Sequence, residues 1–308
     1  MPKYDYEKGE ELGRGQFGVV HRAVIITTGV VVAVKKLIKG TSRKEGIETA
    51  TLREIMLLQE LKHENIIDMI EVYCHNGSIS LVLELCLTDL EIIIKDSSVR
   101  LSAAQVKGYM LGTMRGVAFC HDNWVLHRDL KPGNVFLTTT GVVKVGDFGL
   151  ARSYGSPERK YTGGVVTPWY RAPELLFGAK FYGTAVDLWS IGCIFAELLN
   201  RAPLLPGKSD IEQLSRIFTA RGTPTDQTWP GVASLPDYIR FQDQPGTPLS
   251  ELCPTGTASE LHLLNGLLTL CPGQRITAPT ALEHIYFREA PLPAEPAELI
   301  PARPDKPR

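Results

Sequence analysis

The stretch His127-Arg128-Asp129-Leu130-Lys131-Pro132-Gly133-Asn134 decides the fold. It follows a predicted helix that ends near Asn123, and it precedes two short apolar runs, Val135 to Leu137 and Val142 to Val145, which predict a pair of strands. The second strand leads directly into Asp147-Phe148-Gly149. Two carboxylates, a lysine and an asparagine are therefore expected around one hairpin. Phosphoryl transfer needs such a set, because a carboxylate orients the hydroxyl, a lysine meets the transferred charge and oxygen atoms bind Mg²⁺.

The totals of the chain predict a soluble, globular protein. Its 308 residues are 44% hydrophobic and 22% charged, with a formal net charge of −1. A chain of this length is expected to form two lobes or domains. The small net charge gives no overall electrostatic reason to bind nucleic acid or a membrane.

The cysteines and the N-terminus indicate the compartment. The six cysteines lie far apart, without a CxxC pair or a histidine at zinc-ligand spacing, so we interpret them as reduced thiols of an intracellular protein. The N-terminus lacks the apolar core of a signal peptide, and no uncharged run is long enough to cross a membrane. A cytosolic or nuclear protein is expected.

Two motifs before residue 85 are typical of a nucleotide site. Gly13-Arg14-Gly15-Gln16-Phe17-Gly18-Val19-Val20 lies between two predicted strands, and its glycines let backbone amides approach phosphate oxygens. By itself this stretch fits an ordinary glycine-rich hairpin equally well, whereas a dinucleotide-binding motif is excluded because a strand follows. The next strand carries Val32-Ala33-Val34-Lys35, and its alternation turns Lys35 toward the glycine loop.

Together these motifs resemble the eukaryotic protein kinases, and within them the cyclin-dependent kinases. The resemblance extends from Tyr6 to about Arg288. It implies a two-lobed α+β fold, with a small β-rich N-lobe at residues 1–85 that contains one main helix and a larger helical C-lobe at residues 86–290. It also implies ATP and Mg²⁺ as cofactors.

The resemblance assigns the catalytic roles. Asp129 is the expected base that orients the substrate hydroxyl, Lys131 neutralises charge on the γ-phosphate, and the hydroxyl of Thr167 ties these two residues together. Lys131 and Thr167 also match the serine/threonine branch of the family. Asn134 and Asp147 are expected to hold Mg²⁺.

The ATP site that the resemblance implies is formed by the glycine loop, the strand and helix after it, and the connector between the lobes. Lys35, held by Glu54, is expected to fix the α- and β-phosphates. Leu83 stands where the family usually has phenylalanine, which predicts more room behind the adenine. The expected ATP-binding residues are Leu12, Gly13, Arg14, Gly15, Gln16, Phe17, Gly18, Val20, Ala33, Lys35, Glu54, Leu83, Glu84, Cys86 and Asp89.

Helical spacing within residues 46–61 predicts a surface for a partner. Glu54 and Leu58 share one face, and Leu52 lies about 200° around the helix from Glu54. If Glu54 points inward, Leu52 points outward, although a single exposed leucine is also normal without a partner. Thr51-Leu52-Arg53-Glu54-Ile55 resembles the helix by which cyclin-dependent kinases bind a cyclin, so Leu52 is the expected cyclin contact.

Three arginines predict regulation by phosphorylation. Arg53, Arg128 and Arg152 lie in three elements that meet in the kinase fold, and their guanidinium groups repel one another unless a dianion bridges them. Thr162 lies where the family is phosphorylated on its activation segment. Ser156, which precedes a proline, is a second candidate site.

The substrate pocket and the branch of the family follow from the resemblance too. Val166 and Arg171 match the part of these kinases that accepts proline after the target residue, and Pro168 departs from the usual leucine or arginine there. Tyr154-Gly155-Ser156-Pro157 and Glu174-Leu175-Leu176-Phe177-Gly178-Ala179 are similar to the branch that activates other cyclin-dependent kinases and phosphorylates the RNA polymerase II tail. That branch implies a cyclin, an assembly factor, a transcription-factor complex and protein substrates, in the nucleus or also the cytoplasm.

The C-lobe contains further patterns. Ser102-Ala103-Ala104-Gln105 is a capping box that opens a helix to about Asn123, and Asp210-Ile211-Glu212-Gln213 is a second capping pattern. Residues 222–253 are rich in proline, glycine and aspartate and are expected to form little regular structure. Glu174 with Arg275 matches the family's buried ion pair. Residues 291–308 are proline-rich with few apolar residues, which predicts a disordered tail.

Two alternative functions stay open at this point. The first is a cell-cycle cyclin-dependent kinase, which Gln16-Phe17 disfavours because those enzymes carry an inhibitory Thr-Tyr pair there. The second is a pseudokinase scaffold that binds a cyclin without turnover. Such scaffolds usually lack the lysine, the base or a metal ligand, and this chain retains all of them.

Overall fold

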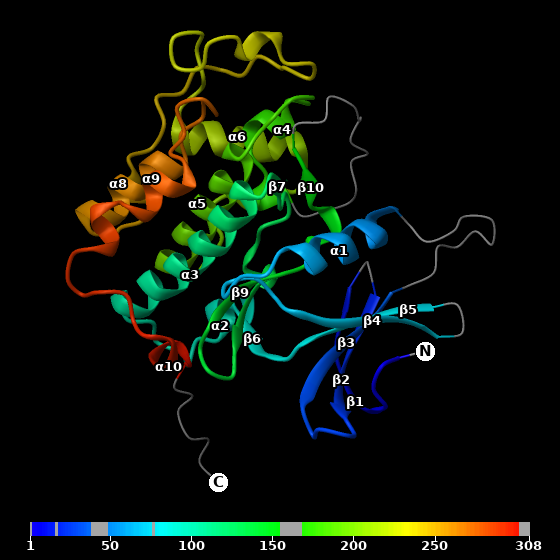
Figure 1. The fold of residues 1–308 in the computed structure, drawn as a ribbon. Coiled ribbons are helices and arrows are strands. Elements are labelled where there is room, and N and C mark those ends of the chain that lie inside the picture. Colours follow the sequence, from blue (N-terminus) through cyan, green and yellow to red (C-terminus); the bar gives the residue numbers. More distant parts are fainter. Residues whose placement is uncertain (1, 16–17, 38–48, 76–77, 155–167, 302–308) are drawn as a thin grey trace.

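The N-terminal part of the chain forms a five-stranded antiparallel sheet with one long helix beside it (Figure 1). This computed structural model describes residues 2–15, 18–37, 49–75, 78–154 and 168–301. The strands lie in the order β1-β2-β3-β5-β4. The elements are β1 (Tyr6–Gly15), β2 (Gly18–Ile25), β3 (Val31–Leu37), α1 (Thr49–Glu60), β4 (Met69–His75) and β5 (Ser78–Glu84).

Alternating side chains give this sheet two different faces. Val32 is fully buried in an apolar cluster on one face. Ala33 and Lys35 point the other way and line a cavity. The register pairs Val20 with Lys35 and Ala33 with Leu83, so side chains from three neighbouring strands meet over that cavity.

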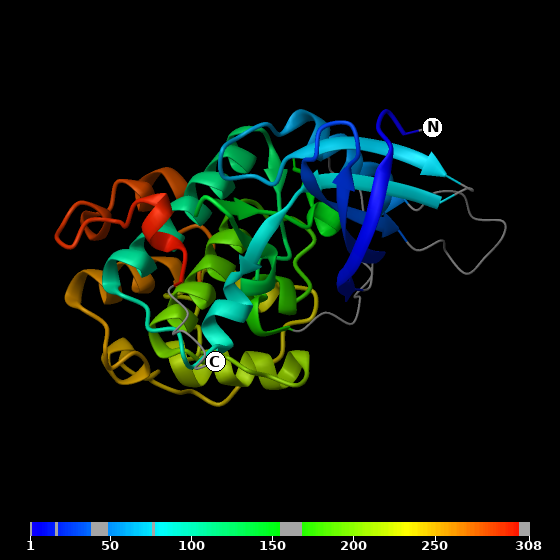
Figure 2. The same cartoon turned by 90° about the horizontal axis from the view of Figure 1, so that it is seen from below.

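The C-terminal part is mainly helical, and Figure 2 shows its helices at one side and the N-terminal strands at the other. Two small sheets lie between these parts, in the orders β6-β8-β9 and β10-β7. Among the described residues, no helix is both long and apolar enough to cross a membrane. The strands and 3₁₀ helices are β6 (Cys86–Asp89), β7 (Val125–Leu126), η1 (Pro132–Asn134), β8 (Val135–Thr138), β9 (Val143–Val145), η2 (Phe148–Leu150), β10 (Arg152–Ser153), η3 (Pro168–Tyr170), η4 (Val232–Ser234) and η5 (Ile285–Phe287). The helices are α2 (Leu90–Lys95), α3 (Ala103–Asp122), α4 (Pro173–Leu176), α5 (Ala185–Asn200), α6 (Asp210–Arg221), α7 (Leu249–Leu252), α8 (Ala258–Leu267), α9 (Ala278–Leu282) and α10 (Pro296–Leu299).

The core of the C-lobe is built on α3 and α5. The predicted capping box is confirmed, because the Ser102 side chain accepts from the Gln105 backbone and Gln105 accepts from the Ser102 backbone before α3. In α5, Trp189 and Ile191 are fully buried, as expected of a helix that is apolar on nearly all sides.

The predicted ion pair between Glu174 and Arg275 is confirmed and is buried. Arg275 donates from Nη1 to Glu174 Oε1 at 2.8 Å and from Nη2 to Oε2 at 3.0 Å. The same guanidinium donates to the carbonyl oxygens of Ala185 and Leu270. It thereby joins α4 to α5 and to the chain after α8. A bidentate pair between charged groups is among the stronger hydrogen-bonded contacts in proteins.

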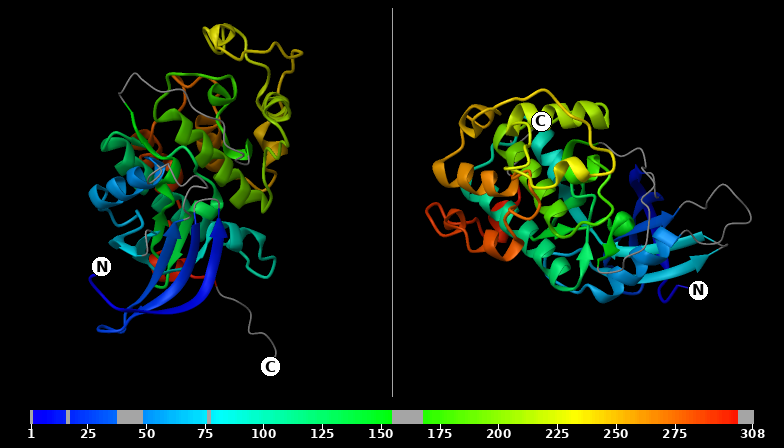
Figure 3. Two further views of the ribbon diagram at one scale, coloured as in Figure 1. Left: turned by 90° about the vertical axis from the view of Figure 1, so that its right-hand side faces the viewer. Right: turned by 90° about the horizontal axis from the view of Figure 1, so that it is seen from above.

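The segment at residues 222–253 has little regular structure, as predicted, with only η4 and α7 in it. It is the yellow part at the top of Figure 1, and Figure 3 also places it at the end of the C-lobe opposite the N-terminal sheet. The second capping pattern is predicted one residue too late. Ser209, and not Asp210, caps α6, because its side chain accepts from the Glu212 backbone.

The prediction of a disordered tail from residue 291 is wrong for residues 291–301. This segment ends in α10, and Leu299 is only 4% exposed. Low apolar content predicts disorder when a segment must form its own core, but here one leucine packs into a slot on α3 and backbone hydrogen bonds to α3 add to it. Residues 302–308 lie outside the described part of the chain.

Candidate active site

A buried aspartate holds the loop after β7 in a strained conformation. Arg128 has φ of +68°, a region that residues with a side chain seldom adopt. Asp187 of α5 accepts from the backbone N–H groups of His127 at 2.9 Å and Arg128 at 2.7 Å. Burial opposes ionisation of Asp187, but the hydrogen bond and charge of His121, the charge of His127 and the Arg128 backbone N–H together outweigh burial and lower the pKa of the carboxyl. The loop that carries Asp129 is therefore fixed by the fold itself.

Asp129 lies in contact with two of the side chains that are predicted to act with it. Lys131 Nζ is 2.9 Å from Asp129 Oδ2. Asn134 Nδ2 donates to the backbone oxygen of Asp129 at 2.7 Å and to Oδ2 at 3.2 Å. Because the amide nitrogen of Asn134 is directed at Asp129, its Oδ1 oxygen is the atom that remains for a cation.

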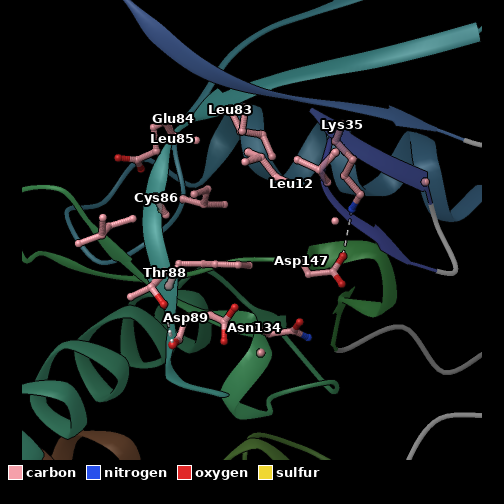
Figure 4. A pocket seen from close by; sticks show the side chains of 18 of the residues that line it. Leu12, Lys35, Leu83, Glu84, Leu85, Cys86, Thr88, Asp89, Asn134 and Asp147 are labelled. Carbon is pink, nitrogen blue, oxygen red and sulfur yellow. Dashed lines mark hydrogen bonds and ion pairs between the residues drawn. The ribbon is translucent and has the colours of Figure 1, made fainter. Parts of the chain in front are cut away.

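A second cluster of charged side chains, Lys35, Glu54 and Asp147, joins three parts of the chain. Lys35 Nζ of β3 is 2.7 Å from Glu54 Oε1 of α1 and 3.1 Å from Asp147 Oδ1, the contact dashed in Figure 4. Burial opposes the charge on both groups, but the carboxylates raise the pKa of Lys35 and the ammonium lowers the pKa of Asp147. Asp147 has φ of +62°, a second strained position in the site. The predicted pairing of Lys35 with Glu54 is confirmed.

The residues around Asp129 and those around Lys35 line one cavity of about 560 Å³ between the lobes (Figure 4). Asp129, Lys131, Asn134 and Asp147 line its C-lobe side. The predicted ATP residues that line it are Leu12, Gly13, Gly18, Val20, Ala33, Lys35, Glu54, Leu83, Glu84, Cys86 and Asp89. A mostly apolar cleft with a few charged groups at one end suits a nucleotide, whose base is apolar on its faces and whose phosphates are charged.

Some lining residues are missing from the sequence prediction. Phe136 lies two residues after Asn134 on β8, and the alternation of that strand was the signal that could have placed it in the cleft. Ile92 of α2 and Leu150 of η2 reach the cavity from positions that only the tertiary fold defines. The other additions are Leu58, Ile67, Leu85, Leu87, Thr88 and Gly133.

Two other predicted site residues that the structure describes, Arg14 and Arg171, do not line the cavity. Arg14 does not line it, because its exposed guanidinium pairs with Glu11 at 3.0 Å. Gly15 ends β1. Gln16, Phe17, Ser156, Thr162, Val166 and Thr167 lie outside the described residues. Arg171 pairs with Asp210 at 3.3 Å, so it stands at the start of α6.

The predicted phosphate-binding arginines lie on three elements. Arg128 donates to the carbonyl oxygen of Leu150 at 2.8 Å and to the hydroxyl of Tyr182 at 2.8 Å. Arg152 is on β10, which pairs with β7 just before the Arg128 loop, and Arg53 is on α1. Their convergence on one phosphate stays a prediction, because Thr162 is outside the described ranges.

The outer face of α1 carries two exposed apolar side chains. Leu52 is 44% exposed, whereas Glu54 is 2% exposed, as the helical geometry predicts. Met56 lies one turn after Leu52 and is 59% exposed, so two neighbouring apolar side chains face solvent. The i, i+4 spacing was present in the sequence and could have added Met56 to the predicted partner surface.

The connector between the lobes is anchored on both sides. Lys144 of β9 donates to Glu84 Oε1 at 2.8 Å, and the same oxygen accepts from the Asp68 backbone at 2.7 Å. Burial and the nearby Glu84 carboxylate raise the pKa of Cys86 to about 12. The Cys86 thiol therefore stays protonated near neutral pH, which makes it a weak nucleophile.

Leu83 lines the cavity beside Ala33, where a phenylalanine would be bulkier. We expect Leu83→Phe to weaken inhibitors that carry a large group behind the adenine by at least about tenfold, about 1.4 kcal/mol. Inhibitors without that group should bind both proteins alike. Measured dissociation constants for such a matched inhibitor pair test this, and equal ratios in both proteins would refute the account of Leu83.

The comparison with known proteins agrees with this geometry. The family model described as "Protein kinase domain" matches residues 6–287. The chain belongs to the protein kinase family. The kinase is also 51% identical to cyclin-dependent kinase 7 of Xenopus laevis over 298 residues, which cover 96% of this chain and 84% of that protein.

Two further relatives support the same placement. The kinase is 44% identical to the serine/threonine-protein kinase KIN28 of Saccharomyces cerevisiae, over 96% of this chain and 97% of that protein. Its fold matches a chain in the structure of the CAK complex from Chaetomium thermophilum bound to ATP-γ-S, with a TM-score of 0.90 and 40% identity. That match covers 96% of this chain and 95% of the other. The two-lobed kinase fold predicted from the sequence is thus confirmed.

These relatives identify the branch of the family and its reaction. The kinase is a cyclin-dependent serine/threonine protein kinase that uses ATP with Mg²⁺. Membership of this branch implies a cyclin and further partners in a complex. The Asn134 oxygen and the Asp147 carboxylate are hard oxygen donors that both line the C-lobe side of the cavity, which fits Mg²⁺.

Proposed function

We propose that this kinase, with a cyclin bound, phosphorylates the activation segments of other cyclin-dependent kinases and the C-terminal tail of RNA polymerase II. The observation that carries this is the meeting of Lys35, Asp129, Asn134 and Asp147 around one cavity in a chain similar to cyclin-dependent kinase 7. All four side chains that the chemistry needs are present. This favours an active enzyme over a cyclin-binding scaffold.

The site residues have separate roles in this proposal. Asp129 orients the substrate hydroxyl and accepts its proton, and Lys131, 2.9 Å from Asp129, meets the charge of the transferred phosphoryl group. Asn134 and Asp147 hold Mg²⁺, which neutralises charge between the β- and γ-phosphates when it is bound. Lys35 holds the α- and β-phosphates and is itself positioned by Glu54. Thr167 ties Asp129 to Lys131 through its hydroxyl.

The ATP-binding residues surround the remaining part of the cleft. Ala33 and Phe136 stand on opposite lobes and enclose the adenine, while the backbone of Glu84 to Cys86 provides polar groups at its edge. Asp89 contacts the ribose. Glycine-loop residues from Leu12 to Val20 cover the phosphates.

The partner surface is the exposed apolar pair Leu52 and Met56 on α1. A cyclin that covers it presses on the helix that carries Glu54 and so favours the pairing with Lys35. An assembly factor and a transcription-factor complex complete the proposed assembly, and the compartment is the nucleus. Val166 and Arg171 form the pocket for a proline after the target residue.

Phosphorylation of Thr162 is the proposed activating step, since Arg53, Arg128 and Arg152 offer three cations to one dianion. We expect Thr162→Ala to lower kcat/KM at least about tenfold, about 1.4 kcal/mol. Steady-state assays of the cyclin-bound kinase measure this, with Thr225→Ala, on the distant 222–253 segment, as control. Unchanged activity of the Thr162 variant with cyclin present would contradict the arginine account.

The test of the proposed function starts from kinase purified with its bound partners. It should transfer phosphate from Mg-ATP to a polymerase-tail peptide, and it should transfer less when the proline after the target serine is replaced by alanine. A preference for cell-cycle substrate peptides would favour the first alternative. An Mg-ATP thermal shift without any transfer would favour a scaffold and overturn the proposal.

A further inference from the structure

Residues 291–301 lie beyond the matched kinase domain, which ends at residue 287, yet they pack against the C-lobe. Figure 1 shows this red segment running from η5 to the lower end of α3, and Figure 2 places α10 beside the same helix. We propose that these residues form a C-terminal clasp that holds the β8–β9 hairpin, and with it Asn134 and Asp147, in position. The second part of this inference rests on the metal-binding roles in the proposed function.

The first contact is a leucine in a slot on α3. A Cβ added at Gly108 would lie 2.6 Å from Leu299 Cδ2, so a side chain at this position would have to displace the end of Leu299. Leu299 is 4% exposed, whereas Leu292 in the same segment is 63% exposed. One leucine of the clasp is therefore an anchor, and the other faces solvent.

Hydrogen bonds fix the backbone of the clasp on the same part of α3. The backbone N–H of Ala294 donates to the Ala104 carbonyl at 2.8 Å, and Gln105 Nε2 donates to the Glu298 carbonyl at 2.8 Å. The hydroxyl of Tyr109 donates to the Leu299 carbonyl. Gln105 also closes the capping box of α3, so the start of this helix and the clasp share a residue.

The second contact reaches the hairpin directly. Gly141 lies in the turn between β8 and β9 with φ of +83°. A Cβ there would lie 1.6 Å from the carbonyl oxygen of Pro296, so the turn and α10 touch backbone to backbone. Any movement of α10 away from α3 removes the neighbour against which this turn is packed.

A third feature places the clasp and β9 on one surface. Gly108, Gly112 and Gly116 recur every four residues and so lie on one face of α3. Leu299 packs at the first and Val143 of β9 at the second, where a Cβ would lie 2.6 Å from Val143 Cβ. The clasp and β9 therefore pack next to each other on the glycine face of α3.

The hairpin connects the two proposed metal ligands. Asn134 immediately precedes β8, and Asp147 follows β9 by two residues. The turn is held internally by the N–H of Gly141 to the Thr138 carbonyl at 3.0 Å and the N–H of Val142 to Thr138 Oγ1 at 3.0 Å. The hydrogen-exchange rates of the Gly141 and Val142 amides therefore show whether the turn stays closed.

The experiment compares Leu299→Ala with Leu292→Ala in the full chain. Leu299→Ala should lower Tm by about 5–10 °C, because a buried leucine is lost, whereas Leu292→Ala should change it by less than about 1 °C. Hydrogen exchange at Gly141 and Val142 should become at least about tenfold faster in Leu299→Ala only. The KM for Mg-ATP should rise at least about threefold while the KM for the peptide stays the same.

The exchange and KM results together decide whether the clasp holds the hairpin. Faster exchange in the turn together with a higher KM for Mg-ATP supports the clasp. Exchange that changes only within residues 294–301 overturns it. Faster turn exchange without any change in the KM for Mg-ATP supports the hold of the clasp on the hairpin and overturns the link to the metal-binding roles of Asn134 and Asp147. Gly108→Leu should also speed up exchange at Gly141 and Val142, because the new side chain fills the slot that Leu299 occupies. Leucine has a higher helix propensity than glycine, so this variant is not expected to weaken α3 itself. The exchange measurement needs no catalysis, so it stays valid if the proposed function fails.

Discussion

Replacing Asp129 with asparagine is expected to lower kcat for peptide phosphorylation by about 10²–10⁴-fold. The amide has nearly the same shape and keeps one oxygen to accept from Lys131 and Asn134, although the ion pair with Lys131 is lost. What is lost is a carboxylate that can orient the hydroxyl and accept its proton. Mg-ATP affinity should change by less than about threefold, since no phosphate contact is removed.

Steady-state kinetics of the cyclin-bound kinase and an Mg-ATP thermal shift separate these two effects. Asp243→Asn is the matched control, because Asp243 is an exposed aspartate in the 222–253 segment. A variant at position 129 that keeps kcat within about threefold of the control would remove Asp129 from the catalytic role.

Replacing Lys35 with methionine should lower kcat/KM by at least about 100-fold and also destabilise the fold. Lys35 is the cation between Glu54 and Asp147, at 2.7 and 3.1 Å, and is 9% exposed. Removing it leaves two carboxylates near each other without their cation, which for a buried pair costs about 3–5 kcal/mol. The carboxylates then repel, and α1 loses its attachment to β3.

Lys36→Met provides the control for this prediction. Lys36 is the next residue on the same strand but is exposed and points to the other face of the sheet. Its replacement should leave kcat/KM within about twofold and Tm within about 1 °C. Activity assays and thermal unfolding of both variants measure the difference, and equal losses at positions 35 and 36 would show that strand damage explains the effect.

Local patterns predicted much of this kinase. The pairing of Lys35 with Glu54 could be predicted from the resemblance to protein kinases. The outward direction of Leu52 then follows from the helix period, which the backbone imposes on any sequence. The capping box at Ser102 is also purely local, since its two hydrogen bonds join residues three apart. The catalytic set around Asp129 could be predicted because one short hairpin carries most of it.

Features that depend on distant packing were not predictable in the same way. Ile92 and Leu150 line the cleft only because α2 and η2 are folded against it. The tail was predicted disordered because its composition cannot form a core alone, but Leu299 packs onto a surface that α3 supplies. Arg14 appeared to belong to the phosphate loop, yet Glu11, three residues earlier, is its partner.

The loop after α1 connects that helix to the C-lobe. The backbone N–H of Ile67 donates to the Val145 carbonyl, and the backbone N–H of Val145 donates to the Asn65 carbonyl, both at 2.9 Å. The chain shortly after the helix is therefore hydrogen-bonded to β9 of the C-lobe. The C-terminal end of α1 is thus its anchored end, and Leu52 lies about 12 Å from there along the helix axis. Glu54 lies about 9 Å from the same end, so a rotation of the helix about that end would move Glu54 about three quarters as far as Leu52 and would change the distance from its carboxylate to the ammonium of Lys35.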